Sequence, residues 1–202
     1  EKRGVRLTYD NEELEIMVPS LDHDRGDRLL AMFIPILAEE LGVPFSPGGS
    51  TTMKLRKALK GIEADDIFWL ANAARLAGVR ELDLKIHPPP DLAIEVDVSR
   101  SSMNRLKIYA KLGVPEVWRL AGDTLTFHVL SGKQYQIATH SQSFPLVASA
   151  DLITFVKQAR AAGDQVPVQK GFRAWVKQHI KKQESGIRDQ EPEKPSTGSS
   201  DS

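Results

Sequence analysis

The spacing of hydrophobic residues in the first part of the chain predicts a hairpin followed by a helix. Residues 5–9 and 14–18 are two short apolar runs on either side of an Asp-Asn turn, a pattern typical of a β-hairpin. From Ser20, a candidate N-cap, apolar residues recur every three or four positions as far as Gly42, which predicts a helix. Pro35 inside this helix should kink it or divide it into two shorter helices.

The remainder of the chain predicts further strands and helices around one central sheet. Strand patterns cover residues 50–57, 63–70, 91–99 and 114–120, a second hairpin covers 124–130 and 135–139, and helix patterns cover 103–112, 150–162 and 171–183. This order predicts an α/β fold of the mixed α+β kind, in one domain over residues 1–184. Residues 185–202 lack an apolar cluster and are rich in Ser, Pro, Glu and Gly, so we expect a disordered tail there.

Composition removes several classes of protein. The 202 residues include no cysteine, which excludes a disulfide framework, a thiolate zinc site and a cysteine nucleophile. Basic and acidic residues number 27 each, and this zero net charge argues against a strongly basic nucleic-acid coat without excluding local basic patches. The longest apolar stretch, residues 29–38, is about half of the roughly 20 residues that a membrane span needs. We therefore expect a cytoplasmic protein that does not cross a membrane.

The strand pattern over residues 91–98 carries the most chemical information. Because side chains alternate between the two faces of a strand, one face is wholly apolar, and the other carries Asp91, Glu95 and Asp97. Successive side chains on that face are about 6.6 Å apart. If the face is buried, the carboxylates repel one another, and Mg²⁺ or Mn²⁺ is the simplest compensation. If it faces solvent, the strand is an ordinary amphipathic one with an acidic outer face. The sequence alone leaves both interpretations open.

Two further positions would complete a metal site. Asp65 belongs to the preceding strand pattern, and if the two strands are neighbours its carboxylate and that of Glu95 could share one cation. The simpler alternative for Asp65 is a charged turn formed with its acidic neighbours. His23 falls on the inward stripe of the first predicted helix, where a single histidine is more often a packed core residue than a ligand.

Basic residues on the helix that follows the acidic strand could act on a phosphate. Arg105 and Lys107 lie in the helix pattern over 103–112, and a cation there could stabilise developing negative charge or orient an attacking water. A solvated basic helix face explains the same residues without any chemistry. The chain contains no phosphate-binding loop, dinucleotide fingerprint or nucleophile elbow.

Six stretches of the chain, taken together, match one known family, although each alone is weak. They are LTYD at 7–10, LEIMVPS at 14–20 with His23, EAD at 63–65 with Phe68-Trp69, PDLAIEV at 90–96, Tyr109-Ala110, and GVPEVW at 113–118. In these stretches the chain resembles the Uma-type restriction endonucleases, a family of the PD-(D/E)XK nuclease superfamily. The resemblance covers roughly residues 5–160.

The resemblance implies a restriction-endonuclease-like fold, a mixed sheet flanked by helices, and phosphodiester hydrolysis in nucleic acid, DNA above all, with Mg²⁺ or Mn²⁺. In such enzymes acidic residues from successive strands bind the metal, and a lysine assists the attacking water. Asp65 and Glu95 match the two acidic positions, with Ala64 where proline is usual. Asp91 matches a further acidic position, and His23 matches a histidine that reaches the metal in some related nucleases. Such nucleases often act as homodimers, and the family's usual N-terminal extension is missing from this sequence.

One departure from the family pattern concerns catalysis. The motif lysine would fall at Asp97, and the lysine that many members carry on the next helix is matched here by Arg105, with Lys107 nearby. Arginine stabilises negative charge but cannot act as a base, because its pKa exceeds about 12. The sequence therefore predicts a metal-dependent endonuclease, with two alternatives. One is a catalytically weakened member that binds nucleic acid or a partner protein, and the other is a metal-binding domain without nuclease activity.

Overall fold

The fold contains ten strands and five α-helices within the residues that the computed structural model describes, which are 6–10, 13–18, 20–55, 60–97 and 104–188. The strands are β1 (Arg6–Asp10), β2 (Glu13–Met17), β3 (Ser46–Pro47), β4 (Thr52–Leu55), β5 (Lys60–Glu63), β6 (Asp66–Trp69), β7 (Leu92–Asp97), β8 (Glu116–Ala121), β9 (Thr124–Ser131) and β10 (Gln134–Ala138). The helices are α1 (Leu21–Ala31), α2 (Phe33–Leu41), α3 (Arg105–Leu112), α4 (Ser149–Ala161) and α5 (Val166–Arg188), with a short 3₁₀ helix over Ala73–Leu76.

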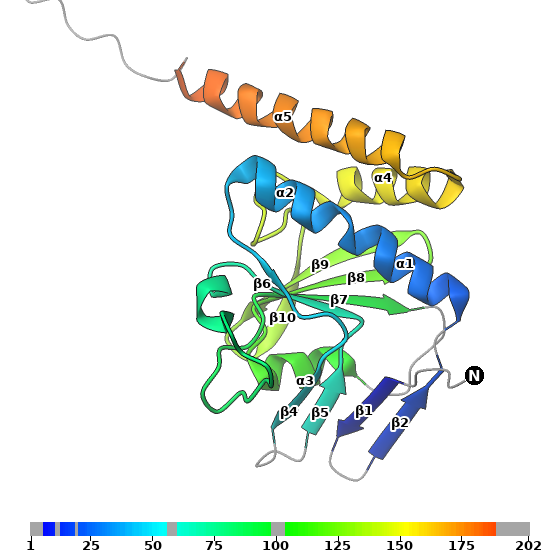
Figure 1. Cartoon of the computed structure of the whole chain (residues 1–202), viewed down its shortest axis with the longest axis vertical. Coiled ribbons are helices and arrows are strands. Elements are labelled where there is room, and N and C mark those ends of the chain that lie inside the picture. Colours follow the sequence, from blue (N-terminus) through cyan, green and yellow to red (C-terminus); the bar gives the residue numbers. More distant parts are fainter. Residues whose placement is uncertain (1–5, 11–12, 19, 56–59, 98–103, 189–202) are drawn as a thin grey trace, which may run out of the picture.

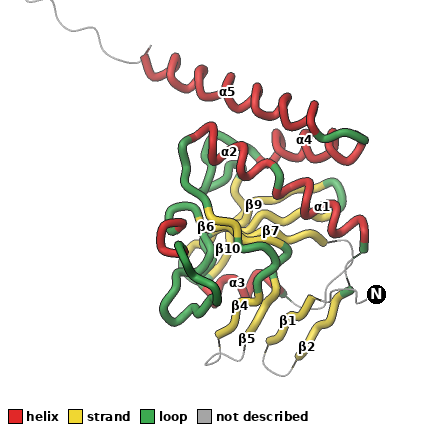
Figure 2. Tube along the Cα trace, in the orientation of Figure 1, coloured by secondary structure: helices red, strands yellow, loops and turns green. Residues whose placement is uncertain are grey.

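The strands form two sheets. A six-stranded sheet has the order β10-β9-β8-β7-β6-β3, and a four-stranded sheet has the order β2-β1-β5-β4. All pairs are antiparallel except β7 and β8, so the larger sheet is mixed, as expected from the sequence. Helices α1, α2, α4 and α5 lie on one side of the larger sheet, and α3 and the smaller sheet lie on the other (Figure 1). The layers are equally clear when the trace is coloured by secondary structure (Figure 2).

The larger sheet separates two hydrophobic cores. On β7, Leu92, Ile94 and Val96 join the core beneath α1, α2, α4 and α5, whereas Ala93 joins the core next to α3. This confirms the apolar face predicted for the strand. Because elements cover both sides of β7, the face that carries Glu95 is also buried, and this residue is only 4% exposed. The alternative of an acidic face in open solvent is therefore wrong for Glu95.

The first predicted helix is divided in two at the expected place. Helix α1 ends at Ala31 and α2 begins at Phe33, which puts Pro35 in the first turn of α2. Proline is tolerated there because the backbone nitrogens of a first turn have no partner within the helix. Ser20 caps α1 and Gly42 ends α2 in a left-handed conformation, both as predicted.

The segment predicted as one strand over residues 63–70 is instead divided between the two sheets. Strand β5 ends at Glu63 in the smaller sheet, and β6 begins at Asp66 in the larger one. Ala64 and Asp65 therefore form the crossing from one sheet to the other. The prediction was wrong here because the strand-like run of residues continues without a break through the crossing.

Some boundaries near the helices also differ from the prediction. Asn104 caps α3, which begins at Arg105, two residues after the predicted start of this helix at residue 103. Helix α5 runs to Arg188, past the predicted end of the domain at residue 184, and the rest of the predicted tail, 189–202, lies outside the described residues. None of the helices within the described residues combines the length and the apolar composition that a membrane span requires.

A buried carboxylate ties the loop after β10 to the start of β8. Glu116 is fully buried and accepts hydrogen bonds from the backbone nitrogens of Gln142 and Ser143, at 3.0 and 2.8 Å. It also accepts from the Ser141 hydroxyl at 3.2 Å and from the Trp118 indole at 3.0 Å. These four donors compensate for the loss of water around the charge, so Glu116 has a structural role.

Replacing Glu116 with glutamine is expected to lower the free energy of unfolding by about 2 kcal/mol. The amide keeps the shape of the side chain but loses the charge. Its NH₂ group can only donate, yet the groups around it are donors, so the hydrogen bonds on that side are lost. Urea denaturation measures the change, with the exposed Glu81→Gln as a control that should differ from wild type by less than about 0.5 kcal/mol. Equal stability of Glu116→Gln and wild type would contradict the anchoring role.

Candidate active site

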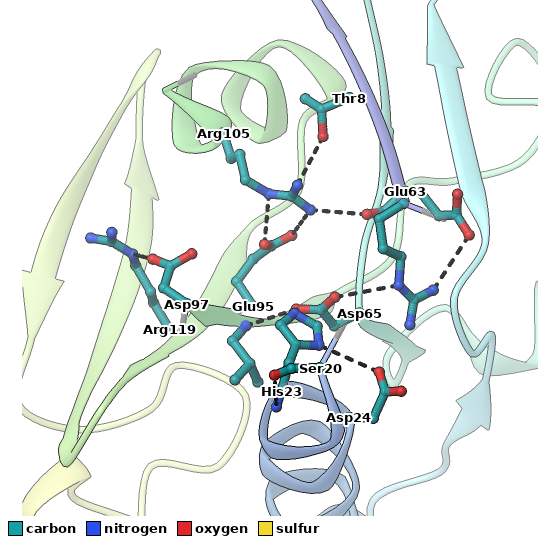
Figure 3. A network of polar contacts seen from close by, with 12 residues as sticks. Thr8, Ser20, His23, Asp24, Glu63, Asp65, Glu95, Asp97, Arg105 and Arg119 are labelled. Carbon is teal, nitrogen blue, oxygen red and sulfur yellow. Dashed lines mark hydrogen bonds and ion pairs between the residues drawn. The ribbon is translucent and has the colours of Figure 1, made fainter. Parts of the chain in front are cut away.

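Asp65 and Glu95 meet at the junction of the two sheets (Figure 3). The Asp65 Oδ2 atom accepts a hydrogen bond of 2.8 Å from the backbone nitrogen of Val96, the residue after Glu95. Both carboxylates are buried, with Asp65 2% exposed and Glu95 4% exposed. The structure therefore brings together the two acidic residues that the sequence singled out first.

The Glu95 carboxylate is held by a guanidinium and a phenol from α3. Arg105 donates from Nη2 to Oε1 at 2.9 Å, and its Nε forms an ion pair with Oε2 at 2.7 Å. Tyr109, one turn further along α3 and fully buried, donates its hydroxyl to Oε1. Burial raises the pKa of Glu95 to about 7, although the Arg105 guanidinium lowers it. Burial and the adjoining Glu95 raise the pKa of Tyr109 well above its ordinary value, so its hydroxyl remains a donor.

Arg105 is fixed by contacts from three directions. Besides its pairing with Glu95, its Nη1 donates to the hydroxyl of Thr8 on β1 at 2.8 Å. Its Nη2 also donates to the backbone carbonyl of Glu63, at the end of β5, at 2.9 Å. Asn104 caps the helix by accepting from the backbone nitrogen of Lys107, which sets Arg105 as the first helical residue. Arg105 thus links α3, the smaller sheet and β7.

His23 approaches Asp65 from the opposite layer. It lies in the first turn of α1, is fully buried, and its Nε2 is 3.3 Å from Asp65 Oδ2. Its Nδ1 is 3.5 Å from Asp24 Oδ1. Burial lowers the pKa of His23, but the two carboxylates, Asp65 above all, raise it above its ordinary value. A Cβ on Gly26 would lie 3.1 Å from a Val96 methyl, so α1 sits close enough on β7 to bring His23 to the site. A metal-binding role for His23 stays a prediction.

Arg6 completes the network from β1. Its Nη1 donates to Glu63 Oε1 at 3.4 Å, and its Nε is 3.6 Å from Asp65 Oδ1. Arg6 and Thr8 both reach the site because alternate residues of a strand share a face. Sequence analysis missed both residues, although the alternation of the first hairpin, with Leu7 and Tyr9 on the other face, was a signal that could have found them.

Two more buried acidic residues lie beside the pair. Asp27 is 4% exposed and follows His23 by four residues, so the two share one face of α1. This spacing is the signal by which the sequence could have revealed it. Burial, and then the charges of Asp65 and Asp66, raise the pKa of Asp27 to about 7. Asp66 accepts from the backbone nitrogen of Ile67 at 2.8 Å, and burial raises its pKa also.

The remaining two predicted site residues do not reach the carboxylate pair. Asp91 lies just before β7, where its carboxylate accepts from the backbone nitrogens of Leu70 and Asn72, at 2.7 and 3.0 Å, and from the Asn72 side-chain amide at 2.8 Å. These bonds anchor the loop after β6. Lys107 is exposed on α3, two residues beyond Arg105 and so about 200° around the helix axis from it. The contacts of Asp91 and Lys107 give no support to their predicted roles.

The chemistry of the site suits a hard divalent cation, but its present contacts do not. Carboxylate oxygens are the ligands that Mg²⁺ and Mn²⁺ prefer, and Asp65 Oδ1 is buried without a hydrogen-bond partner. Both oxygens of Glu95, however, are already engaged by Arg105 and Tyr109. Among the described residues, no three His, Asp or Glu side chains are grouped so as to hold a metal ion. Asp65 and Glu95 would hold a cation together only after Arg105 has released at least one Glu95 oxygen.

The mixed sheet flanked by helices, with acidic side chains at the junction of two sheets, is a restriction-endonuclease-like fold, as predicted. Among solved structures, a protein from Anabaena variabilis titled as a "putative nuclease belonging to DUF820" matches with a TM-score of 0.52. The two sequences are 14% identical, and the match covers 74% of this chain and 90% of the other. The sequence model of the Uma2 family, described as "Putative restriction endonuclease", matches residues 1–156. This chain belongs to the Uma2 family, which confirms the resemblance. No protein among the curated sequences matches it.

Proposed function

We propose that this protein is a metal-dependent endonuclease that hydrolyses phosphodiester bonds of nucleic acid, with DNA as the first substrate to test. The observation that carries the proposal is that two buried carboxylates lie at one site, where Asp65 accepts a hydrogen bond from the backbone nitrogen of Val96, the residue after Glu95. Burial and mutual repulsion both oppose ionisation of these carboxylates, so nearby positive charge favours their charged forms, and a bound divalent cation would supply such charge. Membership in a family described as "Putative restriction endonuclease", and a fold shared with a protein titled as a "putative nuclease", add support.

The side chains around the pair have separate roles in this proposal. Asp65 and Glu95 would hold Mg²⁺ or Mn²⁺, and the bound ion would supply Lewis acidity that lowers the pKa of a water molecule and neutralises charge on the phosphate. His23 orients the Asp65 carboxylate through Nε2, and Tyr109 orients that of Glu95 through its hydroxyl. Arg105 provides positive charge for phosphate oxygens and does not act as a base.

Cleavage assays with supercoiled plasmid, single-stranded DNA and RNA of matched sequence test this function. We expect cleavage with Mg²⁺ or Mn²⁺ and none with EDTA, and the substrate that is cut fastest identifies the nucleic acid. Equal cleavage in EDTA, or no cleavage of any substrate with any divalent cation, would contradict the proposal.

A second candidate function is binding of nucleic acid without cleavage. The pairing of Arg105 with both oxygens of Glu95 favours it, because this contact uses the carboxylate that the metal would need. Binding through phosphate contacts should weaken steeply as salt rises, with a slope set by the number of phosphates neutralised. Binding that is insensitive to salt, or measurable cleavage by the same preparation, would contradict this candidate.

A further inference from the structure

We infer that Arg105 is a built-in competitor of the divalent cation, so that pairing of Arg105 with Glu95 and binding of the cation at Glu95 exclude each other. The inference rests on the proposed function, since it concerns the cation that Asp65 and Glu95 would share. It adds a regulatory property of the site, namely that an internal side chain sets the cation concentration at which the site fills.

The geometry of the guanidinium supports competition. Arg105 meets Oε1 of Glu95 through Nη2 and Oε2 through Nε, so both oxygens already face a positively charged group. The Tyr109 hydroxyl adds a further donor to Oε1. A positive charge at this position also balances the Glu95 carboxylate, which is the electrostatic task of the cation itself.

The anchoring of Arg105 shows that the contact is a defined state of the site. Its side chain is 10% exposed, and its guanidinium bonds the Thr8 hydroxyl and the Glu63 backbone carbonyl as well as Glu95. Thr8 is only 1% exposed, so the departure of Arg105 leaves a buried hydroxyl that must find another partner. The cation must offset this cost in addition to displacing the ion pair.

Asp65 meets weaker competition than Glu95. Its Oδ1 is buried without a hydrogen-bond partner and has only a long ion pair with Arg6 Nε, at 3.6 Å, while His23 Nε2 lies 3.3 Å from Oδ2. Oδ1 of Asp65 therefore lacks the close contacts by which Arg105 covers Glu95. A cation that takes Glu95 frees the guanidinium, which then becomes available to an anion such as a phosphate. Cation and phosphate should consequently strengthen each other's binding.

Calorimetric titration with Mn²⁺ of wild type, Arg105→Gln and Lys111→Gln tests the inference without any assay of activity. Lys111 is an exposed cation in the last turn of the same helix and serves as the matched control. We expect Arg105→Gln to bind Mn²⁺ roughly 10-fold or more tightly than wild type, and Lys111→Gln to bind as wild type does. Circular dichroism confirms that each variant is folded.

Arg105→Lys carries the test if Arg105→Gln does not fold. Lysine keeps the charge but cannot cover both carboxylate oxygens at once, so we expect a smaller gain in Mn²⁺ affinity, in the same direction. Equal or weaker Mn²⁺ binding by the Arg105 variants than by wild type would overturn the inference and leave the proposed function standing. Absence of Mn²⁺ binding in every form would overturn both.

Discussion

Replacement of Glu95 by glutamine, or of Asp65 by asparagine, should reduce metal-dependent cleavage of DNA by at least about 100-fold. Each change keeps the size of the side chain and removes one of the two charges that would hold the cation. Even residues that only orient a metal ligand commonly contribute 10- to 100-fold to affinity or activity, and a ligand should contribute more. Rates of plasmid nicking at saturating Mn²⁺ measure the effect.

Asp97→Asn is the matched control for this prediction. Asp97 lies two residues after Glu95 on the same face of β7, and it forms an ion pair with Arg119 at 2.6 Å, away from Asp65. Asp97→Asn should cleave DNA as wild type does. Cleavage by Glu95→Gln or Asp65→Asn at the rate of Asp97→Asn would show that the carboxylate pair is not the catalytic centre.

Asp27→Asn should stabilise the protein above neutral pH and remove part of the dependence of its stability on pH. The pKa of Asp27 is about 7 in the folded protein, against an ordinary value of 3.8. Between these two values the folded state binds more protons than the unfolded state, so the stability contributed by Asp27 falls as pH rises from about 4 to 7. Asparagine stays neutral throughout, and at pH 8 it should raise the free energy of unfolding by an amount of the order of 3 kcal/mol.

Urea denaturation at pH 5 and pH 8, in EDTA, measures this effect. The gain in free energy of unfolding of Asp27→Asn over wild type should be larger at pH 8 than at pH 5. The reason is that Asp27 in the folded wild type is mostly protonated at pH 5. Asp22→Asn, an exposed change in the first turn of the same helix, should show no such difference between the two pH values. A gain that is the same at both pH values would mean that Asp27 is not protonated in the folded protein.

The sequence predicted the features of the fold that depend on local pattern. The two faces of β7 followed from strict alternation, and the division of the first helix followed from Pro35. The pairing of Asp65 with Glu95 was predicted as a possibility that depended on the two segments being neighbours. The structure shows that they are, through the hydrogen bond from Val96 to Asp65.

Contacts between segments distant in sequence were beyond the reach of these patterns. No local signal indicated that the chain would cross between sheets at Ala64 and Asp65, because strand-like residues continue on both sides. The bonds of Arg105 to Thr8 and to the Glu63 carbonyl span 97 and 42 residues of sequence. The site role predicted for Asp91 depended on a contact of the same kind. Alternation places Asp91 on the same face as Glu95, but its carboxylate accepts hydrogen bonds from Asn72 in the loop after β6.

A crystal structure of the protein soaked in Mn²⁺, with anomalous scattering used to locate the metal, tests the central claim most directly. The account predicts an anomalous peak about 2.0–2.6 Å from one oxygen of Asp65 and one oxygen of Glu95, with the Arg105 guanidinium displaced from at least one Glu95 oxygen. The contradicting result comes from a preparation that cleaves DNA with Mn²⁺. Its crystals would show no anomalous peak between these carboxylates, and Arg105 would remain on both Glu95 oxygens.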